Sequence, residues 1–321
     1  MKKFLCLFLG LILVMTVFAG CNIIPEDNAD SNNDATLENT ESRTDTNPQD
    51  TESENVLVEN PATDFEYEIN DAGYVFITKY IGSSKSVVIP SEIEGREVVS
   101  LKGFQDTPIE TVVLPVTIRV IGAGAFESCT ALTTVIIPPD SQLLAIQLGA
   151  FDGCSALKSI GIDNAENLKT IEMTAFRNCI SIEKIKFPSN LETIGKYAFE
   201  NCSALRSVNI PAKLELRYGD ASRFYKVPAL EEIIFDEGRE SITGYVFFSI
   251  TSTVNVIIPE SVTNIDMLMF GNAGTLNLYF SGDYPQITNA DMSGNVTVHY
   301  DPSTNGWDTI PLSEFHIMIP S

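Results

Sequence analysis

The amino-acid sequence predicts an α/β repeat solenoid in which each repeat adds one strand to a parallel sheet and returns through a short helical or irregular segment. Two columns of residues support this fold. A phenylalanine recurs eight times between residues 104 and 270, at spacings of 22, 25, 25, 23, 25, 23 and 23 residues. A proline follows the same spacing between residues 90 and 259, with Asp163 and Asp236 in two of its places. Such periods indicate a solenoid, because no single repeat can bury its own apolar face.

The first twenty residues have the order of an export signal. Two lysines precede an apolar run, which ends in Phe18-Ala19-Gly20-Cys21. This ending resembles the lipobox of bacterial lipoproteins, which implies a signal peptide over residues 1–20, cleavage before Cys21 and lipidation of its sulfur. An uncleaved transmembrane anchor is the alternative, although the run is shorter than the ~20 residues that a spanning helix needs.

The next segment, residues 21–62, is polar and acidic. After Cys21 it carries eleven carboxylates and a single base, Arg43. Its few apolar residues cannot offset the entropy cost of ordering the chain. We therefore predict a lipidated cysteine followed by a disordered, self-repelling tether. Binding of basic partners or cations by this segment is the alternative.

Short β elements are predicted to cap both ends of the solenoid. In residues 63–98, aromatic and apolar residues alternate with polar ones up to a turn at Asn70-Asp71-Ala72-Gly73, which indicates a hairpin. Residues 283–321 are predicted to form the C-terminal cap, with Trp307 packed inside it rather than offered to a ligand. Caps are needed because a bare solenoid end exposes core side chains and a strand edge.

Each repeat between residues 99 and 282 is expected to bury its apolar positions. In Leu132-Thr-Thr-Val135-Ile-Ile137-Pro138 the numbered apolar residues would face the core. The proline would end the strand, because it removes a backbone donor. The following Ile, Ala, Phe and Cys have a spacing suited to a short helical turn. The repeat around Phe224 lacks the upstream isoleucine, which predicts an irregular turn there.

The repeated pattern Ile-Gly-x-x-Ala-Phe-x-x-Cys-x-x-Leu-x-x-Val/Ile-x-Ile-Pro resembles the BspA-type leucine-rich repeat of bacterial surface proteins. The resemblance covers about residues 85 to 282. It implies a leucine-rich-repeat-like parallel sheet and a location outside the cytoplasm. Some members of that family are adhesins toward host proteins or other bacteria, so the resemblance also implies a binding function, without identifying the ligand.

Four cysteines occupy the position three residues after successive phenylalanines: Cys129, Cys154, Cys179 and Cys202. The weaker repeats mostly have apolar residues there, which predicts a buried column of free thiols. Disulfides between neighbouring rungs are the alternative, since stacked strands lie about 4.8 Å apart and export permits oxidation. The paired short spacings of a zinc site are missing, so no metal or other cofactor is predicted.

Composition argues against several functions. The formal net charge of -23 is wrong for a nucleic-acid partner, because phosphate binding depends on clustered positive charge. The sequence has only two histidines and lacks a nucleophile elbow, a zinc-binding helix motif, a phosphate loop and a dinucleotide fingerprint. We therefore predict no enzyme activity and no catalytic residue.

The outward positions of the strands form the surface that the core does not constrain. Four bases fall there on three adjacent strands: Lys158, Lys184, Lys186 and Arg206. A positive patch on an acidic domain suits an acidic protein segment or an anionic glycan. The alternative is that these residues only solubilise the surface and are balanced by nearby glutamates. Outward isoleucines in the same columns favour a protein partner.

Together these features predict a monomeric, lipid-anchored surface protein that binds a host or bacterial protein, or an anionic glycan, through the patch. Two other functions remain open. One is a structural envelope protein without a dedicated ligand, and the other is an accessory glycan-binding component. The latter would need aromatic residues on the strand face. The outward positions that we assign, which end with Val254, Asn255 and Ile257, contain none.

Overall fold

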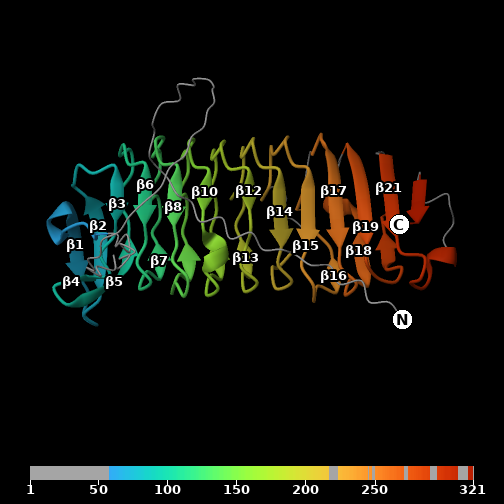
Figure 1. The fold of residues 1–321 in the computed structure, drawn as a ribbon, viewed down its shortest axis with the longest axis horizontal. Helices are drawn as coiled ribbons and strands as arrows, with labels where there is room; N and C mark the ends of the chain where they lie inside the picture. The colour runs from blue at the N-terminus through green and yellow to red at the C-terminus, as the bar shows by residue number, and fades with distance from the viewer. Residues whose placement is uncertain are drawn as a thin grey trace, which may run out of the picture. The chain divides into compact units, whose positions relative to one another are not determined.

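The chain forms a β-solenoid from residue 58 onward (Figure 1). The structure is a computed structural model that describes residues 58–216, 223–244, 246–247, 250–270, 274–289, 295–309 and 317–320. Residues 55–321 make one compact unit. The predicted signal peptide, Cys21 and the tether up to residue 57 lie outside the described residues, as does the predicted irregular turn over 217–222.

Each turn of the solenoid contributes one strand to a broad series, which we name the strand face, and one strand to a narrower series. The strand face consists of β3 (Ser86–Val88), β6 (Thr111–Val113), β8 (Thr134–Ile136), β10 (Ser159–Ile160), β12 (Lys184–Ile185), β14 (Ser207–Ile210), β15 (Glu232–Phe235), β17 (Thr253–Ile258), β19 (Thr275–Phe280), β21 (Asn295–Tyr300) and β22 (Ile317–Pro320). The narrower series consists of β5 (Arg96–Leu101), β7 (Val120–Ile121), β9 (Ala145–Ile146), β11 (Thr170–Ile171), β13 (Thr193–Ile194), β16 (Ser241–Ile242), β18 (Asn264–Asp266) and β20 (Gln286–Thr288). Where strands of successive rungs pair, the pairing is parallel in both series, and each series is divided into two sheets, between β10 and β12 and between β13 and β16.

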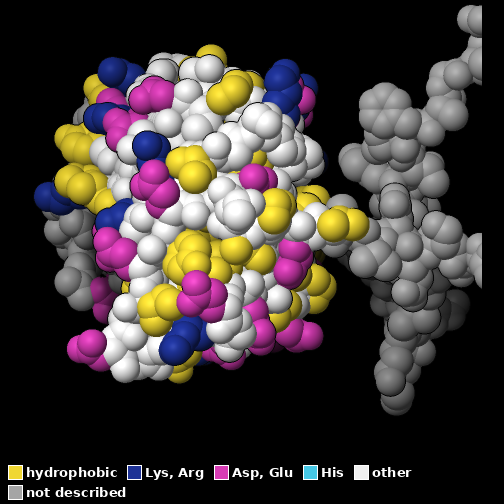
Figure 2. Space-filling view, turned by 90° about the vertical axis from the view of Figure 1, so that its left-hand side faces the viewer, with side chains coloured by type: hydrophobic (Ala, Val, Ile, Leu, Met, Phe, Trp, Pro, Cys, Tyr) yellow, Lys and Arg dark blue, Asp and Glu magenta, His cyan; other side chains and the backbone are white. Residues whose placement is uncertain are grey.

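The predicted N-terminal hairpin is present. Strands β1 (Phe65–Ile69) and β2 (Val75–Tyr80) pair antiparallel after the 3-10 helix η1 (Ala62–Asp64), and β4 (Glu92–Ile93) pairs antiparallel with β5. Asn60 covers the free edge of β3, because its backbone N–H donates to the Val88 carbonyl at 2.9 Å and its Oδ1 accepts from Val88 N–H at 2.8 Å. Figure 2 views this end of the solenoid, where apolar, acidic and basic side chains are interspersed.

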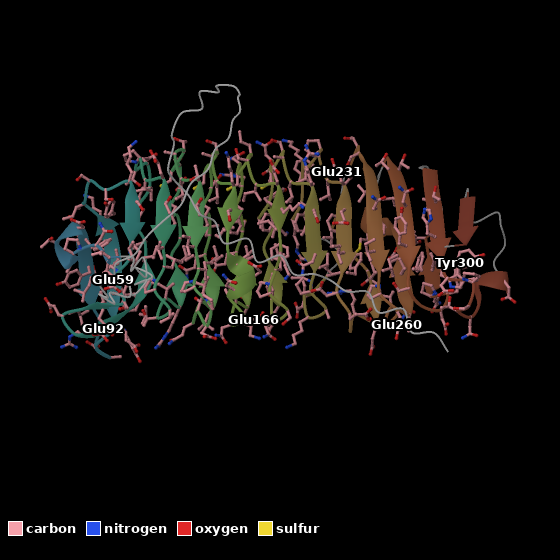
Figure 3. The ribbon with its side chains drawn as sticks, viewed as in Figure 1. Glu59, Glu92, Glu166, Glu231, Glu260 and Tyr300 are labelled. Atoms are coloured by element: carbon pink, nitrogen blue, oxygen red, sulfur yellow. The ribbon has the colours of Figure 1, made fainter. Side chains whose placement is uncertain are left out.

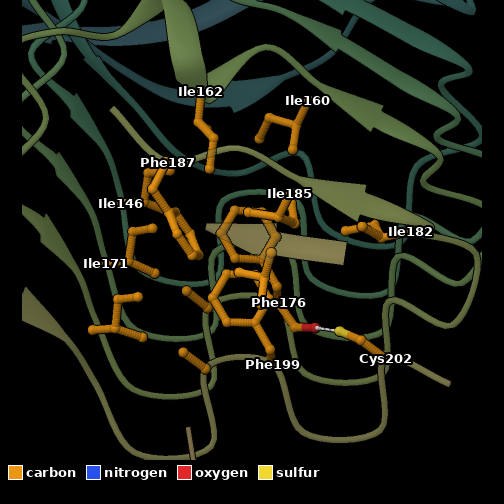
Figure 4. Packing of buried hydrophobic residues seen from close by; sticks show 14 of the residues in the cluster. Ile146, Ile160, Ile162, Ile171, Phe176, Ile182, Ile185, Phe187, Phe199 and Cys202 are labelled. Carbon is orange, nitrogen blue, oxygen red and sulfur yellow. Dashed lines mark hydrogen bonds between the residues drawn. The ribbon is translucent and has the colours of Figure 1, made fainter. Parts of the chain in front are cut away.

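The predicted phenylalanine column forms the centre of the core. The rings from Phe104 to Phe247 follow one another at centroid distances of 5.0 to 5.2 Å, and Phe270 continues the column at 6.4 Å. Tyr80 extends it into the cap, stacked on Phe104 at 5.3 Å. Figure 4 shows Phe176 and Phe199 among the surrounding isoleucines. Leu132, Val135 and Ile137 are buried as predicted.

The predicted helical returns, and with them the α/β class, are not confirmed. Within the described ranges the only helices are 3-10 turns of three or four residues: η1, η2 (Ile162–Asn164), η3 (Met267–Phe270) and η4 (Trp307–Thr309). The returns are irregular because two positions in each of the five returns from Phe104 to Phe199 have positive φ, for example Gly124 and Ser128, which an α-helix cannot accommodate. The backbone N–H groups of Gly124, Phe126 and Ser128 donate to carbonyls of the next rung instead.

Part of the variation in repeat length is absorbed at one corner of the solenoid, between the strand face and the narrower series. The buried Leu191 comes three positions after Pro188, whereas the buried Leu143 comes five positions after Pro138. The phenylalanine spacings across these two corners, 23 and 25 residues, differ by the same amount. The ring column therefore keeps a constant step while the corner varies.

The predicted thiol column is buried, and its four cysteines are free. Each thiol donates to the carbonyl of a phenylalanine in the preceding rung, at 2.9 Å for Cys129 to Phe104 and 3.2 Å for Cys202 to Phe176. Burial raises the pKa of all four thiols, to about 12 for Cys202. These thiols therefore stay protonated and unreactive in the folded chain.

The C-terminal cap closes around Trp307, as predicted. Its ring stacks on Tyr300 at a centroid distance of 4.8 Å and meets Phe280 edge-on at 4.9 Å. Its indole N–H donates to the Gly282 carbonyl at 3.1 Å. A buried ring with a satisfied donor is a packing residue rather than a ligand platform.

Candidate binding site at a break in the strand face

The strand face is interrupted between β10 and β12. One sheet ends at β10 and another begins at β12, although the two strands belong to successive rungs. On either side the ladder is intact, with Lys158 N–H donating to the Thr133 carbonyl at 2.9 Å and Arg206 N–H to the Glu183 carbonyl at 2.7 Å. Between residues 158–162 and 183–187 no backbone hydrogen bond joins the rungs.

The break has a local cause in the sequence of the β10 rung. Gly161 leaves the extended conformation, with φ −77° and ψ 49°, and η2 follows where other rungs continue as strand. Asp163 stands in the place of the usual proline, and Asn164 Nδ2 ties the turn back to the Ile137 carbonyl at 2.9 Å. On the far side, Asn209 Oδ1 accepts the Phe187 N–H at 2.7 Å. Both rungs are thus drawn away from each other.

The opening is a local wedge rather than a separation of the solenoid. Ser181 Oγ still donates to the Ser155 carbonyl at 2.7 Å, and the rings of Phe151 and Phe176 remain 5.2 Å apart. Above this intact core lie two adjoining hollows of about 440 and 540 Å³, which share Asp163, Lys184 and Lys186 in their walls.

The floor of the wedge is apolar. Ile160 and Ile185 are 8% and 4% exposed, whereas Val135 and Val208, which hold the same position on the flanking rungs, are 1% and 0% exposed. Figure 4 shows Ile160, Ile162 and Ile185 at this place beside Phe187. The break therefore gives a ligand access to side chains that the rest of the face keeps covered.

Three of the four predicted bases surround the wedge. Lys158, Lys184 and Lys186 are exposed and have no ion pair within 4 Å among the described residues. Arg206 instead forms an ion pair with Glu231, which is labelled in Figure 3. The structure thus brings three lysines together and separates Arg206 from them as a neutralised residue.

Several acidic and polar residues of the site were not predicted. Asp163, Glu166, Glu183 and Asp236 also line the hollows. Burial raises the pKa of Asp236, while a hydrogen bond from Asn209 Nδ2 at 3.0 Å and the charge of Lys186 act in the opposite direction. The available sequence signal was the replacement of proline by aspartate at 163 and 236, because aspartate tolerates the turn and adds charge.

The predicted outward positions need correction at β17. Val254 is buried, and the outward residues of this strand are Thr253, Asn255 and Ile257. The error is one residue, which on a strand exchanges the two faces.

Aromatic residues do occur on the strand face beyond β17, where the assigned outward positions end. In the Ile257 column lie Tyr279 of β19 and His299 of β21, stacked at a centroid distance of 4.3 Å. Each ring covers a face of the other, so the pair does not present an open flat platform.

The described residues show no other functional centre of the kinds sought. Within the ranges given above, no group of three histidine, cysteine, aspartate or glutamate residues is placed to hold a metal ion. No helix in the same ranges is long and apolar enough to cross a membrane. The predicted lipidation site, Cys21, lies outside the described residues.

Comparison with known proteins identifies the repeat. The family model of the BspA type leucine rich repeat region matches residues 97–221 and 217–295, in six copies. No curated protein is significantly similar in sequence. Among solved structures, a leucine rich cell surface protein from Faecalibacterium prausnitzii A2-165 is 17% identical, with a TM-score of 0.47, over 83% of this chain and 95% of that one. A leucine rich repeat protein from T. pallidum is 24% identical, with a TM-score of 0.42, over 62% of this chain and 86% of that one. One from Bacteroides ovatus is 21% identical, with a TM-score of 0.44, over 83% of this chain and 76% of that one.

Proposed function

Because the chain belongs to the BspA-type leucine-rich repeat family, we propose that it is a surface recognition protein, anchored by a lipid on Cys21, that binds a partner protein through the strand face. Binding rather than catalysis fits a fold whose outward strand positions form a regular array. Attachment of the partner to a host or bacterial surface would make the protein an adhesin.

The observation that carries this proposal is the group of unpaired lysines at the wedge. Lys158, Lys184 and Lys186 face a hollow with an apolar floor, on a chain of net charge -23. Lysines that form no ion pair within 4 Å with any described residue, grouped in an otherwise acidic field, attract and orient a negatively charged partner. An apolar floor adds the contact area that charges alone do not supply.

The proposed location rests on the N-terminal sequence and on the family. Phe18-Ala19-Gly20-Cys21 has the form of a lipobox after an apolar run, and a similar solved structure is described as a cell surface protein. Replacement of Cys21 by serine should move the protein from the membrane fraction to the soluble fraction of a bacterial host. Retention of the C21S variant in the membrane would contradict lipid anchoring through this residue.

The binding proposal can be tested on intact cells by photo-crosslinking. A photoreactive amino acid in place of Ser159, which lines the hollow, should form an adduct with one protein. The same group in place of Asp71, on the turn of the N-terminal hairpin, should not.

Charge variants then assign the adduct to the lysines. The triple variant K158Q/K184Q/K186Q should lose the adduct. The matched control K79Q/K102Q/K196Q removes the same charge from exposed lysines elsewhere and should retain it. Equal adducts in both variants would refute the site. An adduct with glycan instead of protein would favour the glycan-binding alternative.

A further inference from the structure

We infer that the wedge between β10 and β12 receives a short, extended acidic peptide segment of the partner, which pairs with the open edge of β12. This inference rests on the proposed function, since it specifies which part of a partner protein is recognised. The lysines alone would select a ligand only by its charge. Pairing with β12 adds recognition of the ligand's backbone.

The first argument is the backbone at the break. In the intact ladder, outward residues direct their backbone groups to the preceding rung, as Gly161 N–H does to the Val135 carbonyl at 3.3 Å. Core-facing residues direct theirs to the following rung, as Leu114 N–H does to the Ile136 carbonyl at 2.9 Å. Lys184 and Lys186 are the outward residues after the break, and within residues 58–216 neither reaches the preceding rung. Their backbone groups therefore border the hollow as an exposed strand edge.

An exposed edge of this kind selects an extended main chain. Addition of a peptide strand to a sheet edge uses alternating donors and acceptors, which a simple anion or a sugar does not offer. The two hollows, of about 440 and 540 Å³, fall in the size range of ligand pockets and leave room for a few residues of extended chain rather than a helix.

The second argument is the placement of charge. Lys184 and Lys186 are two residues apart, so alternate side chains of a paired strand, about 6.6 Å apart, match their spacing. Lys158 faces the same hollow from the opposite rung. The carboxylates of Asp163 and Glu166 lie toward the turn, where they would repel further acids. The hollow of the lysines holds three bases against the carboxylates of Asp163 and Glu183, so negative side chains of the ligand fit best at the lysine end.

The third argument is the floor. Ile160 and Ile185 are the most exposed members of their core column among the neighbouring rungs. In an extended peptide, successive side chains point to opposite faces. If the acidic side chains point to the lysines, the side chains between them point to the apolar floor. An alternating acidic and apolar sequence therefore fits the wedge better than a run of acids.

The test uses the full chain and a defined probe, the fluorescent peptide acetyl-(Glu-Val)₃-amide, with binding followed by anisotropy at low salt. The mirror-image peptide of D-residues has the same charge and composition but cannot pair in the same way. We expect the L-peptide to bind about tenfold more tightly than the D-peptide, and K184Q/K186Q to weaken it about tenfold. The control K79Q/K102Q should leave binding unchanged.

A second variant closes the wedge without touching a lysine. G161V/D163P restores the β-branched outward residue and the proline of the intact rungs, as in Val113-Leu114-Pro115 and Ile136-Ile137-Pro138. It should slow hydrogen exchange at the Lys186 amide and abolish binding of the L-peptide. Circular dichroism shows whether the variant keeps the β-solenoid. If it does not, the L-to-D ratio of the native chain decides alone.

The outcomes separate this inference from the proposed function. Equal binding of L- and D-peptides, or unchanged binding by a folded G161V/D163P variant, overturns the strand-pairing inference. The lysine-dependent crosslink from Ser159 would still support the proposed function in that case. Tight binding of heparin with no binding of either peptide overturns the inference and assigns the lysines to a glycan. If the control K79Q/K102Q also lost the crosslink and the peptide binding, the effect would not be specific to the wedge lysines. That result would refute the wedge as the site.

Discussion

Replacement of Phe176 by leucine tests whether the ring column stabilises the solenoid through ring–ring contact. Phe176 is fully buried between Phe151 and Phe199, at centroid distances of 5.2 and 5.1 Å. Leucine keeps an apolar side chain in place but removes both contacts. Each aromatic pair contributes about 0.5–1.5 kcal/mol beyond its buried area, so F176L should lower the free energy of unfolding by about 1–3 kcal/mol.

The matched variant is F270L at the end of the column. Among the described residues, Phe270 has one ring neighbour, Phe247, at the longer distance of 6.4 Å. The same substitution should therefore cost less, about 1 kcal/mol or below. Urea unfolding followed by far-ultraviolet circular dichroism measures both changes. If F270L is as destabilising as F176L, burial alone accounts for the column and the stacking argument is refuted.

Three further predictions concern other contacts of the core and the returns. Burial raises the pKa of Cys202 from 9.0 to about 12, so the folded chain holds a proton that the unfolded chain releases above pH 9. Stability should therefore fall as the pH rises from about 9 to 12, with a weaker fall in C202A; an identical profile in C202A would contradict this. Thr174 has φ 56°, which a β-branched residue adopts at a cost of about 1–2 kcal/mol. T174G should therefore raise the melting temperature. The control T170G, at an extended position in β11, should lower it. Arg177 pairs with the nearly buried carboxylate of Asp152. R177A leaves that carboxylate without its partner, so it should lower the free energy of unfolding in urea by about 2 kcal/mol, and D152N by about 1 kcal/mol. The reverse order would refute this reasoning.

The stacked-rung architecture was predictable from the sequence because the same pattern of buried residues recurs in every repeat. Two independent columns, phenylalanine and proline, had the same period, and the buried positions within a rung followed from alternation. Even the weak copies around Phe224, Phe247 and Phe270 take their places in the column. A contact that recurs in every rung is predictable from one sequence, because the same residue type appears at the same position in several repeats.

The form of the returns was not predictable from apolar spacing alone. Ala125, Phe126 and Cys129 have a spacing that suits a helical turn, and they are buried as one would expect from it. The decisive feature is the positive φ at Gly124 and Ser128. Glycine or asparagine in these two positions of several repeats was the available signal. At Thr174 and Tyr197 the rung geometry imposes the conformation on residues that do not favour it.

The sequence predicted which basic residues lie together at the candidate site, but it did not predict the break in the strand face. The columns placed Lys158, Lys184 and Lys186 on adjacent strands, and the structure confirms that they lie together. The break itself depends on Gly161 leaving the extended conformation and on a side chain from the next rung, Asn209, replacing a backbone acceptor. These residues depart from the repeated pattern, so the other copies give no indication of the break.

The variable corner between the strand face and the narrower series has a practical consequence. A five-residue corner lies between Phe151 and Phe176 and a three-residue corner between Phe176 and Phe199, yet these rings stay 5.2 and 5.1 Å apart, so the extra residues leave the phase of the column unchanged. Foreign peptides can therefore be grafted after Pro211 or Pro259 as display loops, whereas Pro188 lines the wedge and is unsuitable. The scaffold would carry them along one side of the molecule.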